Sequence, residues 1–175
     1  MTIHFNKTLP ESLEKMNIKK YHTIPIHDSE TLRTVQTSDE IIDRYGKAKW
    51  KIVDLLNGYY QQKVSTTFDL YNWLHKNKDD EVSYFLSEAG SNCLNYATFK
   101  APSEFHLWLG ENSFIIGIEQ KGDSFPAQKI DQQWLKENDG AAFTFFRECK
   151  SKIFFNHPEK ATIVYLECFV KNVHS

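Results

Sequence analysis

Residues 85–97 read Phe85-Leu86-Ser87-Glu88-Ala89-Gly90-Ser91-Asn92-Cys93-Leu94-Asn95-Tyr96-Ala97, and they carry two patterns at helical spacing. Apolar residues recur at steps of three and four and predict one buried helix face; these are Val82, Phe85, Leu86, Ala89, Cys93 and Ala97. Glu88, Asn92 and Asn95 recur at steps of four and three and share a second face. A carboxylate one turn from a carboxamide can hold a hard cation and a water together. The stretch therefore favours nucleotide chemistry, although glutamate and asparagine also occur on ordinary solvated helix faces.

The periodicity of the remaining sequence predicts the other helices and strands. Helices are expected over residues 38–62, with an interruption or bend near Gly46, and over residues 68–74 and 138–151. Strands are expected at residues 22–26, 105–109, 114–118, 153–155 and 161–169, and those at residues 105–109 and 114–118 are expected to form a β-hairpin. Pro10 and Pro25 are read as breakers, and Pro25 confines its strand to a sheet edge. Residues 122–139 lack clear periodicity and predict a loop or lid. Together these elements predict an α+β fold, a two-layer α/β sandwich whose mixed, mostly antiparallel sheet carries its helices on one face.

Length, charge and cysteine content restrict the class of protein. The 175 residues suffice for one domain with a hydrophobic core. A formal net charge of -2 argues against nucleic-acid binding, which needs a basic surface. The three cysteines form no CxxC pair and the seven histidines form no pair at ligand spacing, so neither set predicts a metal site. The polar N-terminus and the lack of a long apolar run predict a cytoplasmic protein without a membrane partner.

Four segments between residues 80 and 170 resemble the conserved boxes of one protein family. They are residues 87–97, Gly117-Ile118-Glu119-Gln120-Lys121-Gly122-Asp123-Ser124-Phe125, Gly140-Ala141-Ala142-Phe143-Thr144-Phe145-Phe146-Arg147 and Ala161-Thr162-Ile163-Val164-Tyr165-Leu166. The first resembles the N box of the GHKL ATPases, which include gyrase-type topoisomerases, sensor histidine kinases and anti-sigma-factor serine kinases. The others are similar to that family's later boxes in order and spacing, and the Phe-Phe-Arg helix looks most like the anti-sigma-factor kinase branch. The resemblance implies a GHKL-like ATP-binding domain over residues 61–175, with residues 1–60 as an N-terminal extension and helix packed on it in one compact unit.

The resemblance also implies roles for the residues that match these boxes. Glu88 would act as the general base, and Asn92 would ligate Mg²⁺ beside the phosphates of ATP. Gln120 would accept the adenine amino hydrogen with support from Thr162, and the helix that starts at residues 140–142 would present its N-terminus to phosphate. The implied cofactor-binding residues are Asn92, Asn95, Gln120, Gly122, Gly140, Ala141, Ala142 and Thr162.

These roles imply an ATP-binding protein of the GHKL type, with the activity of a serine kinase of the anti-sigma-factor class. Such a kinase transfers the γ-phosphoryl group of ATP to a regulatory protein partner, of the anti-sigma antagonist or sigma factor type. The resemblance also suggests a homodimer.

The chain departs from the family pattern at four positions of the expected pocket. Gln120 replaces an aspartate, while Ser124, Ala142 and Ala161 replace glycines, whose missing side chain lets the backbone approach a ligand closely. These changes favour a second hypothesis, a relative impaired in nucleotide binding that acts as a protein–protein interaction module in a partner switch. A third hypothesis, an unrelated α+β domain that matches the boxes by chance, stays open.

Overall fold

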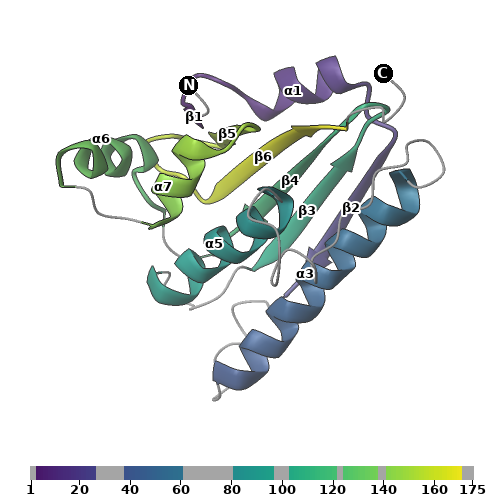
Figure 1. Ribbon diagram of the computed structural model, residues 1–175, viewed down its shortest axis with the longest axis horizontal. Helices are drawn as coiled ribbons and strands as arrows, with labels where there is room; N and C mark the ends of the chain where they lie inside the picture. The colour runs from purple at the N-terminus through teal and green to yellow at the C-terminus, as the bar shows by residue number, and fades with distance from the viewer. Residues whose placement is uncertain are drawn as a thin grey trace.

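The computed structural model describes residues 3–26, 38–60, 81–96, 103–121, 124–137 and 141–170 (Figure 1). Within its helices, the side chains of residues 38, 39, 41, 88, 90–96, 134–137, 141 and 142 lie outside the description. The helix predicted over residues 68–74 falls outside the described residues, and so do Gly122 and Gly140.

One six-stranded sheet runs through the described part of the molecule. Its strands are β1 (Ile3–His4), β2 (Lys20–Pro25), β3 (Glu104–Leu109), β4 (Ser113–Glu119), β5 (Lys152–Phe155) and β6 (Ile163–Phe169), in the spatial order β1-β5-β6-β4-β3-β2. Only β1 and β5 pair in parallel, and the other four pairings are antiparallel. The predicted α+β fold with a mixed, mostly antiparallel sheet is therefore confirmed. The predicted hairpin is also confirmed, and β2 with its terminal proline lies at a sheet edge, as expected.

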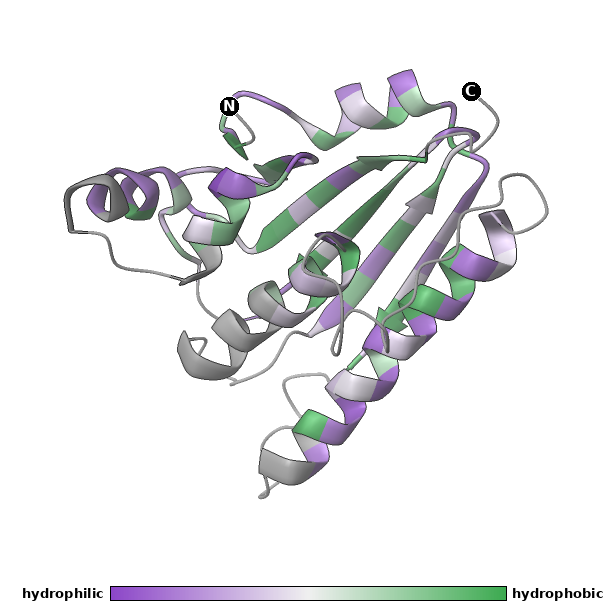
Figure 2. Ribbon diagram, in the orientation of Figure 1, coloured by the Kyte–Doolittle hydropathy of each residue, from purple (hydrophilic) through white to green (hydrophobic). Residues whose placement is uncertain are grey.

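Three helices cover one face of this sheet and enclose the main core. They are α3 (Ser38–Tyr60), α5 (Glu81–Tyr96) and α7 (Ala141–Glu148). The described apolar residues of the α5 stripe are all buried, as the periodicity predicted. Alternate strand residues meet them from the sheet, for example Phe105 and Leu107 on β3 and Phe114 and Ile116 on β4. Figure 2 shows these apolar bands alternating with polar ones along the strands. The helix of residues 38–60 is continuous, so the interruption predicted near Gly46 is wrong.

A short helix, α1 (Leu9–Met16), packs against the other face of the sheet and was not predicted. Its residues Leu9, Leu13 and Met16 join a second, smaller core with Trp108, Ile115, Phe154 and Tyr165. Pro10, which is predicted to interrupt regular structure, instead lies in the first turn of α1, where no intrahelical N–H bond is lost. The N–H of Thr8 donates to the Glu11 carboxylate at 3.2 Å, which helps to start the helix.

The loop or lid predicted for residues 122–139 is wrong over most of its length. Residues Ala127–Glu137 form the helix α6, which begins directly after Pro126. Ala127 is fully buried and Ile130, three residues on, packs against the main core. Arg147 of α7 bonds the Asp131 carboxylate and, at 3.1 Å, the Asp131 carbonyl oxygen. Among the described side chains of α6, these apolar contacts and this ion pair hold the helix on the domain.

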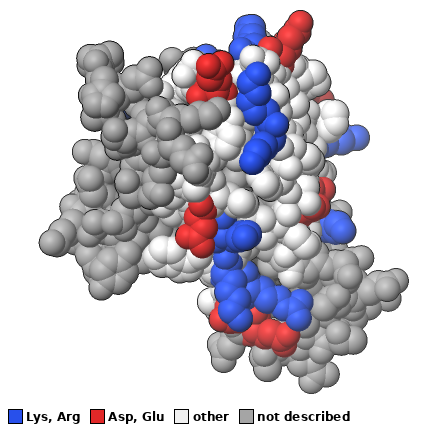
Figure 3. Space-filling view, turned by 90° about the vertical axis from the view of Figure 1, so that its right-hand side faces the viewer, with Lys and Arg blue, Asp and Glu red and all other residues white. Residues whose placement is uncertain are grey.

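The first 60 residues are integrated into the sheet. Residues 3–26 supply both of its edge strands, β1 and β2, and α3 packs on the sheet beside α5 (Figure 1). Basic and acidic side chains are interspersed on the face that Figure 3 shows. Among the described helices, none is both long and apolar enough to cross a membrane.

Candidate functional site

The helices α5 and α7, which carry two of the family-like boxes, pack against each other in antiparallel directions. The rings of Tyr84 and Phe145 stack with centroids 4.5 Å apart, and those of Phe85 and Phe146 lie 6.3 Å apart. The carboxylate of Glu81, at the start of α5, accepts hydrogen bonds from the backbone that follows α7, at Lys150 and Ser151. The start of α5 therefore lies beside the end of α7.

This orientation places the second half of α5 and the first turn of α7 at the same end of the helix pair. Positions 88, 92 and 95 lie from the middle of α5 onward, and the first turn of α7 contains Ala141 and Ala142. All five lie on helical backbone, but their side chains are outside the description. The backbone thus brings together the helix turn expected to carry the general base and the helix N-terminus expected to face phosphate.

Gln120 and Thr162, the two residues expected at the adenine, lie side by side. The N–H of Gln120 donates to the carbonyl oxygen of Thr162 at 2.9 Å, directly beyond the pairing of β4 with β6. Asn156 holds Thr162 from the other side: its amide donates to the Thr162 hydroxyl at 2.8 Å, and its carbonyl accepts from the Thr162 N–H at 3.0 Å. Asn156 was missed as a site residue, although an asparagine in a predicted turn commonly bonds nearby backbone in this way.

The segment after Gln120 returns to the start of β6 through backbone contacts. Phe125 and Ala161 exchange two N–H···O bonds of 2.9 and 2.8 Å, and the Ala161 methyl is fully buried. Both backbone amides therefore have protein partners. At this position, where the family pattern has a glycine, the alanine side chain is buried in the main core.

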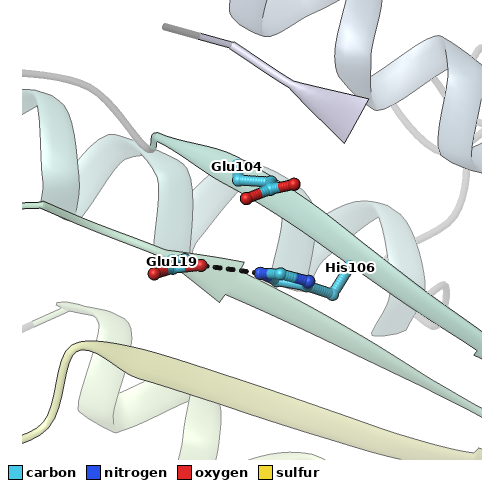
Figure 4. A group of neighbouring side chains, drawn as sticks. All are labelled: Glu104, His106 and Glu119. Carbon is cyan, nitrogen blue, oxygen red and sulfur yellow. Dashed lines mark hydrogen bonds and ion pairs between the residues drawn. The ribbon is translucent and has the colours of Figure 1, made fainter. Parts of the chain in front are cut away.

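A second group of polar residues lies on the opposite face of the sheet and was not predicted. Glu104 and His106 project from β3, and Glu119 from β4 (Figure 4). The Nε2 atom of His106 lies 2.7 Å from a carboxylate oxygen of Glu119. One ligand atom from each residue lies within 4.8 Å of the others. One sequence signal for this group was available: the Glu-x-His spacing of β3 places two possible metal ligands on the same strand face. The third residue, on β4, could not be predicted in this way, because its position depends on the register of the hairpin.

An aromatic stack borders this group. The Tyr21 hydroxyl of β2 lies 2.7 Å from Nδ1 of His106, and the Tyr21 ring stacks on Trp108 with centroids 4.9 Å apart. Burial, followed by the charges of Glu104 and Glu119, raises the pKa of Tyr21 above its ordinary value. The phenol therefore keeps its proton at neutral pH and can donate it to His106.

No family model matches the chain, and no curated protein matches it. The function must be inferred from the residues and their arrangement.

Proposed function

We propose that this chain is an ATP-binding domain of the GHKL type. The observation that supports the proposal is that the four matching segments pair two by two in the fold. The antiparallel pair of α5 and α7 supplies two of them, and the hydrogen bond between Gln120 and Thr162 joins the other two. These segments are up to 74 residues apart in sequence, from Glu88 to Thr162, so their pairing is a property of the fold.

The residues of the expected pocket are partly suited to bind ATP and Mg²⁺. The Thr162 hydroxyl accepts from Asn156, which leaves its own proton able to donate to a ligand. The N-terminus of α7 offers backbone N–H groups of the kind that bind phosphate. On this proposal Asn92 ligates Mg²⁺, Glu88 is the base, and Asn95, Gly122 and Gly140 border the nucleotide. Bound ATP would supply a transferable phosphoryl group.

The finer proposal is a cytoplasmic serine kinase of the anti-sigma-factor class. It would act as a homodimer on a regulatory protein partner, of the antagonist or sigma factor type. Glu88 would accept the proton of the partner's serine hydroxyl. The order of α5, the β3–β4 hairpin, α7 and the closing β5–β6 hairpin supports this branch of the resemblance.

A second function, a protein-interaction module without nucleotide turnover, is favoured by one specific feature. Ala161 is fully buried and bonded to Phe125 through both backbone groups, so this part of the expected pocket is filled by the protein itself. Gln120 also lacks the charge of the family's aspartate. A domain of this kind would act through its surface in a partner switch.

Thermal unfolding with and without Mg²⁺-ATP distinguishes the two functions. A ligand at about 100 times Kd stabilises the folded state by about 2.7 kcal/mol. For a chain of this length, that corresponds to a rise in Tm of about 5–10 °C. Asn92→Ala should abolish the rise. The matched control is Asn112→Ala, in the β3–β4 turn at the other end of the sheet, where the side chain is exposed.

Each outcome of this experiment has a meaning. A rise that Asn92→Ala removes and Asn112→Ala keeps supports the proposed site. A rise that survives Asn92→Ala contradicts the Mg²⁺ role of that residue. If the unmutated protein shows no rise at millimolar Mg²⁺-ATP, the interaction module is the better function.

A further inference from the structure

The group of Glu104, His106 and Glu119 is built on paired strands and not on loops. Side chains alternate between the two faces of a strand, so Glu104 and His106 share the face opposite the main core. The hairpin register sets Glu119 directly across from Glu104. Two strands of a six-stranded sheet therefore fix all three Cα positions, which is the rigid support that a ligand site needs.

Among the described residues, no lysine or arginine compensates the charges of this group. Glu104 and Glu119 are direct cross-strand partners, and like charges in that position destabilise a sheet. In the part of the chain that the structure describes, no lysine or arginine lies within 4.0 Å of either carboxylate. His106 contacts only one of them, Glu119, at 2.7 Å. A bound cation between the two strands would offset the repulsion.

The imidazole of His106 is held in one orientation by residues outside the group. Tyr21 bonds Nδ1 at 2.7 Å, and the ring lies nearly parallel to that of Trp108, at an angle of 15° and a centroid distance of 5.5 Å. These contacts direct Nε2 toward Glu119 and Glu104. Metal-binding histidines are oriented in the same way, by a hydrogen bond at the nitrogen that does not bind the metal.

We propose that Glu104, His106 and Glu119 form a binding site for one divalent transition-metal ion, of which Zn²⁺ is the representative probe. One imidazole nitrogen and two carboxylate oxygens suit Zn²⁺, whereas Mg²⁺ and Ca²⁺ prefer sites made of oxygen alone. Ligand atoms around a tetrahedral zinc ion lie about 3.3 Å apart, given metal–ligand distances of about 2.0–2.2 Å. The three ligand atoms, which lie within 4.8 Å of one another, reach that spacing by small side-chain rotations.

Metal binding requires the His106 tautomer whose proton is on Nδ1, because the ion takes the Nε2 lone pair. In the neutral imidazole the proton therefore changes from one ring nitrogen to the other and none is released, and the hydrogen bond with Tyr21 reverses, so that Nδ1–H donates to the hydroxyl oxygen. Three protein ligands leave a fourth position of the ion for water or a small anionic ligand. The site lies on the opposite sheet face from α3, α5 and α7, and none of its three ligands is a residue of the proposed nucleotide site.

Calorimetric titration of the full chain, freed of metal with a chelator, tests the site. We expect one Zn²⁺ per chain and no measurable binding of Mg²⁺ or Ca²⁺. Tyr21→Phe should weaken the affinity about 10-fold, the lower bound for loss of a group that orients a ligand. Glu104→Gln and His106→Ala should each weaken it by more than that. The matched control is His22→Ala, on the neighbouring strand β2, which should bind Zn²⁺ as the unmutated protein does.

The isosteric Glu104→Gln variant keeps the test meaningful if other variants unfold. Because it removes the like-charge contact, its metal-free Tm should equal or exceed that of the unmutated protein, while its Zn²⁺ affinity falls. Unchanged affinity in Glu104→Gln or His106→Ala would overturn the proposal. Loss of binding in His22→Ala, or the absence of one-to-one binding in the unmutated chain, would overturn it as well.

Discussion

The hydroxyl group of Tyr60 joins α3 to the β3–β4 turn, and its removal should destabilise the whole domain. Tyr60 is the last residue of α3 and is fully buried. Its oxygen lies 2.8 Å from the carbonyl oxygens of both Gly110 and Ser113. One hydroxyl proton serves one carbonyl at a time. The Ser113 carbonyl has a second donor, the Gly110 N–H at 2.8 Å, so Tyr60→Phe chiefly affects the Gly110 carbonyl.

The magnitude follows from leaving a buried carbonyl group without a hydrogen bond. That change costs about 1–3 kcal/mol, so Tyr60→Phe should lower the free energy of unfolding by this amount. In a chain of this length each kcal/mol shifts Tm by about 2–4 °C, which predicts a decrease of about 2–12 °C. Urea denaturation followed by circular dichroism measures the first quantity, and calorimetry measures the second.

A second buried tyrosine provides the control for this prediction. Tyr165 is 3% exposed, and among the described residues its hydroxyl makes no hydrogen bond, so Tyr165→Phe should change stability by less than 0.5 kcal/mol, roughly the scale of a neutral substitution. If Tyr60→Phe is no more destabilising than Tyr165→Phe, the hydrogen bond contributes nothing and the reasoning is refuted.

Both variants should unfold in one transition, because α3 packs on the sheet to which the first strands belong. Two separate transitions would show that residues 1–60 unfold independently.

The remaining predictions concern an ion pair and a buried thiol. Lys7→Met should lower the free energy of unfolding by about 3–5 kcal/mol, because it leaves the Glu167 carboxylate, 5% exposed and 2.8 Å from Lys7, buried without its partner. The double variant Lys7→Met/Glu167→Leu should recover most of this loss in free energy of unfolding. If the effects of the two substitutions are additive, the two side chains are not energetically coupled and the prediction is wrong. Burial raises the pKa of the Cys149 thiol from 9.0 to about 12, so the folded state disfavours the thiolate. The contribution of this thiol to the free energy of unfolding is complete below the pKa of the unfolded state and is lost as pH rises above it. Between about pH 9 and pH 10 the stability of Cys149→Ala should therefore decline less than that of the unmutated protein. Equal declines in denaturation midpoints for Cys149→Ala and the unmutated protein would contradict this assignment.

Local sequence patterns determined those parts of the fold whose signals are strong over short distances. The three- and four-residue spacing from Val82 to Ala89 identified the buried face of α5, and all four of its described residues are buried. The alternation of β3 and β4 identified a hairpin, because the two strands pair across a short turn. Pro25 correctly indicated an edge strand, since a proline offers no N–H to a further neighbour. Each of these signals depends on contacts within about 15 residues or on one backbone group.

Weak periodic signals explain the elements that sequence reading missed. α1 contains a proline, which ends a helix in its interior but is tolerated in the first turn, and the sequence alone did not show which position it holds. α6 has few apolar residues, and its contact between Asp131 and Arg147 joins two helices. β1 has only two residues, and its parallel pairing with β5 spans about 150 residues of chain.

Residue spacing alone establishes which residues share a helix or strand face, whereas the residues that each face contacts depend on the tertiary packing. Glu104 and His106 share a strand face because side chains alternate with a period of two. That they meet Glu119 depends on the hairpin register, and that Tyr21 orients His106 depends on a pairing between strands 85 residues apart. Likewise, the spacing of Glu88 and Asn92 is local, but the antiparallel packing of α5 on α7 is set by aromatic contacts over about 60 residues. Such contacts are selected by the free energy of the whole packed core, which no local pattern encodes.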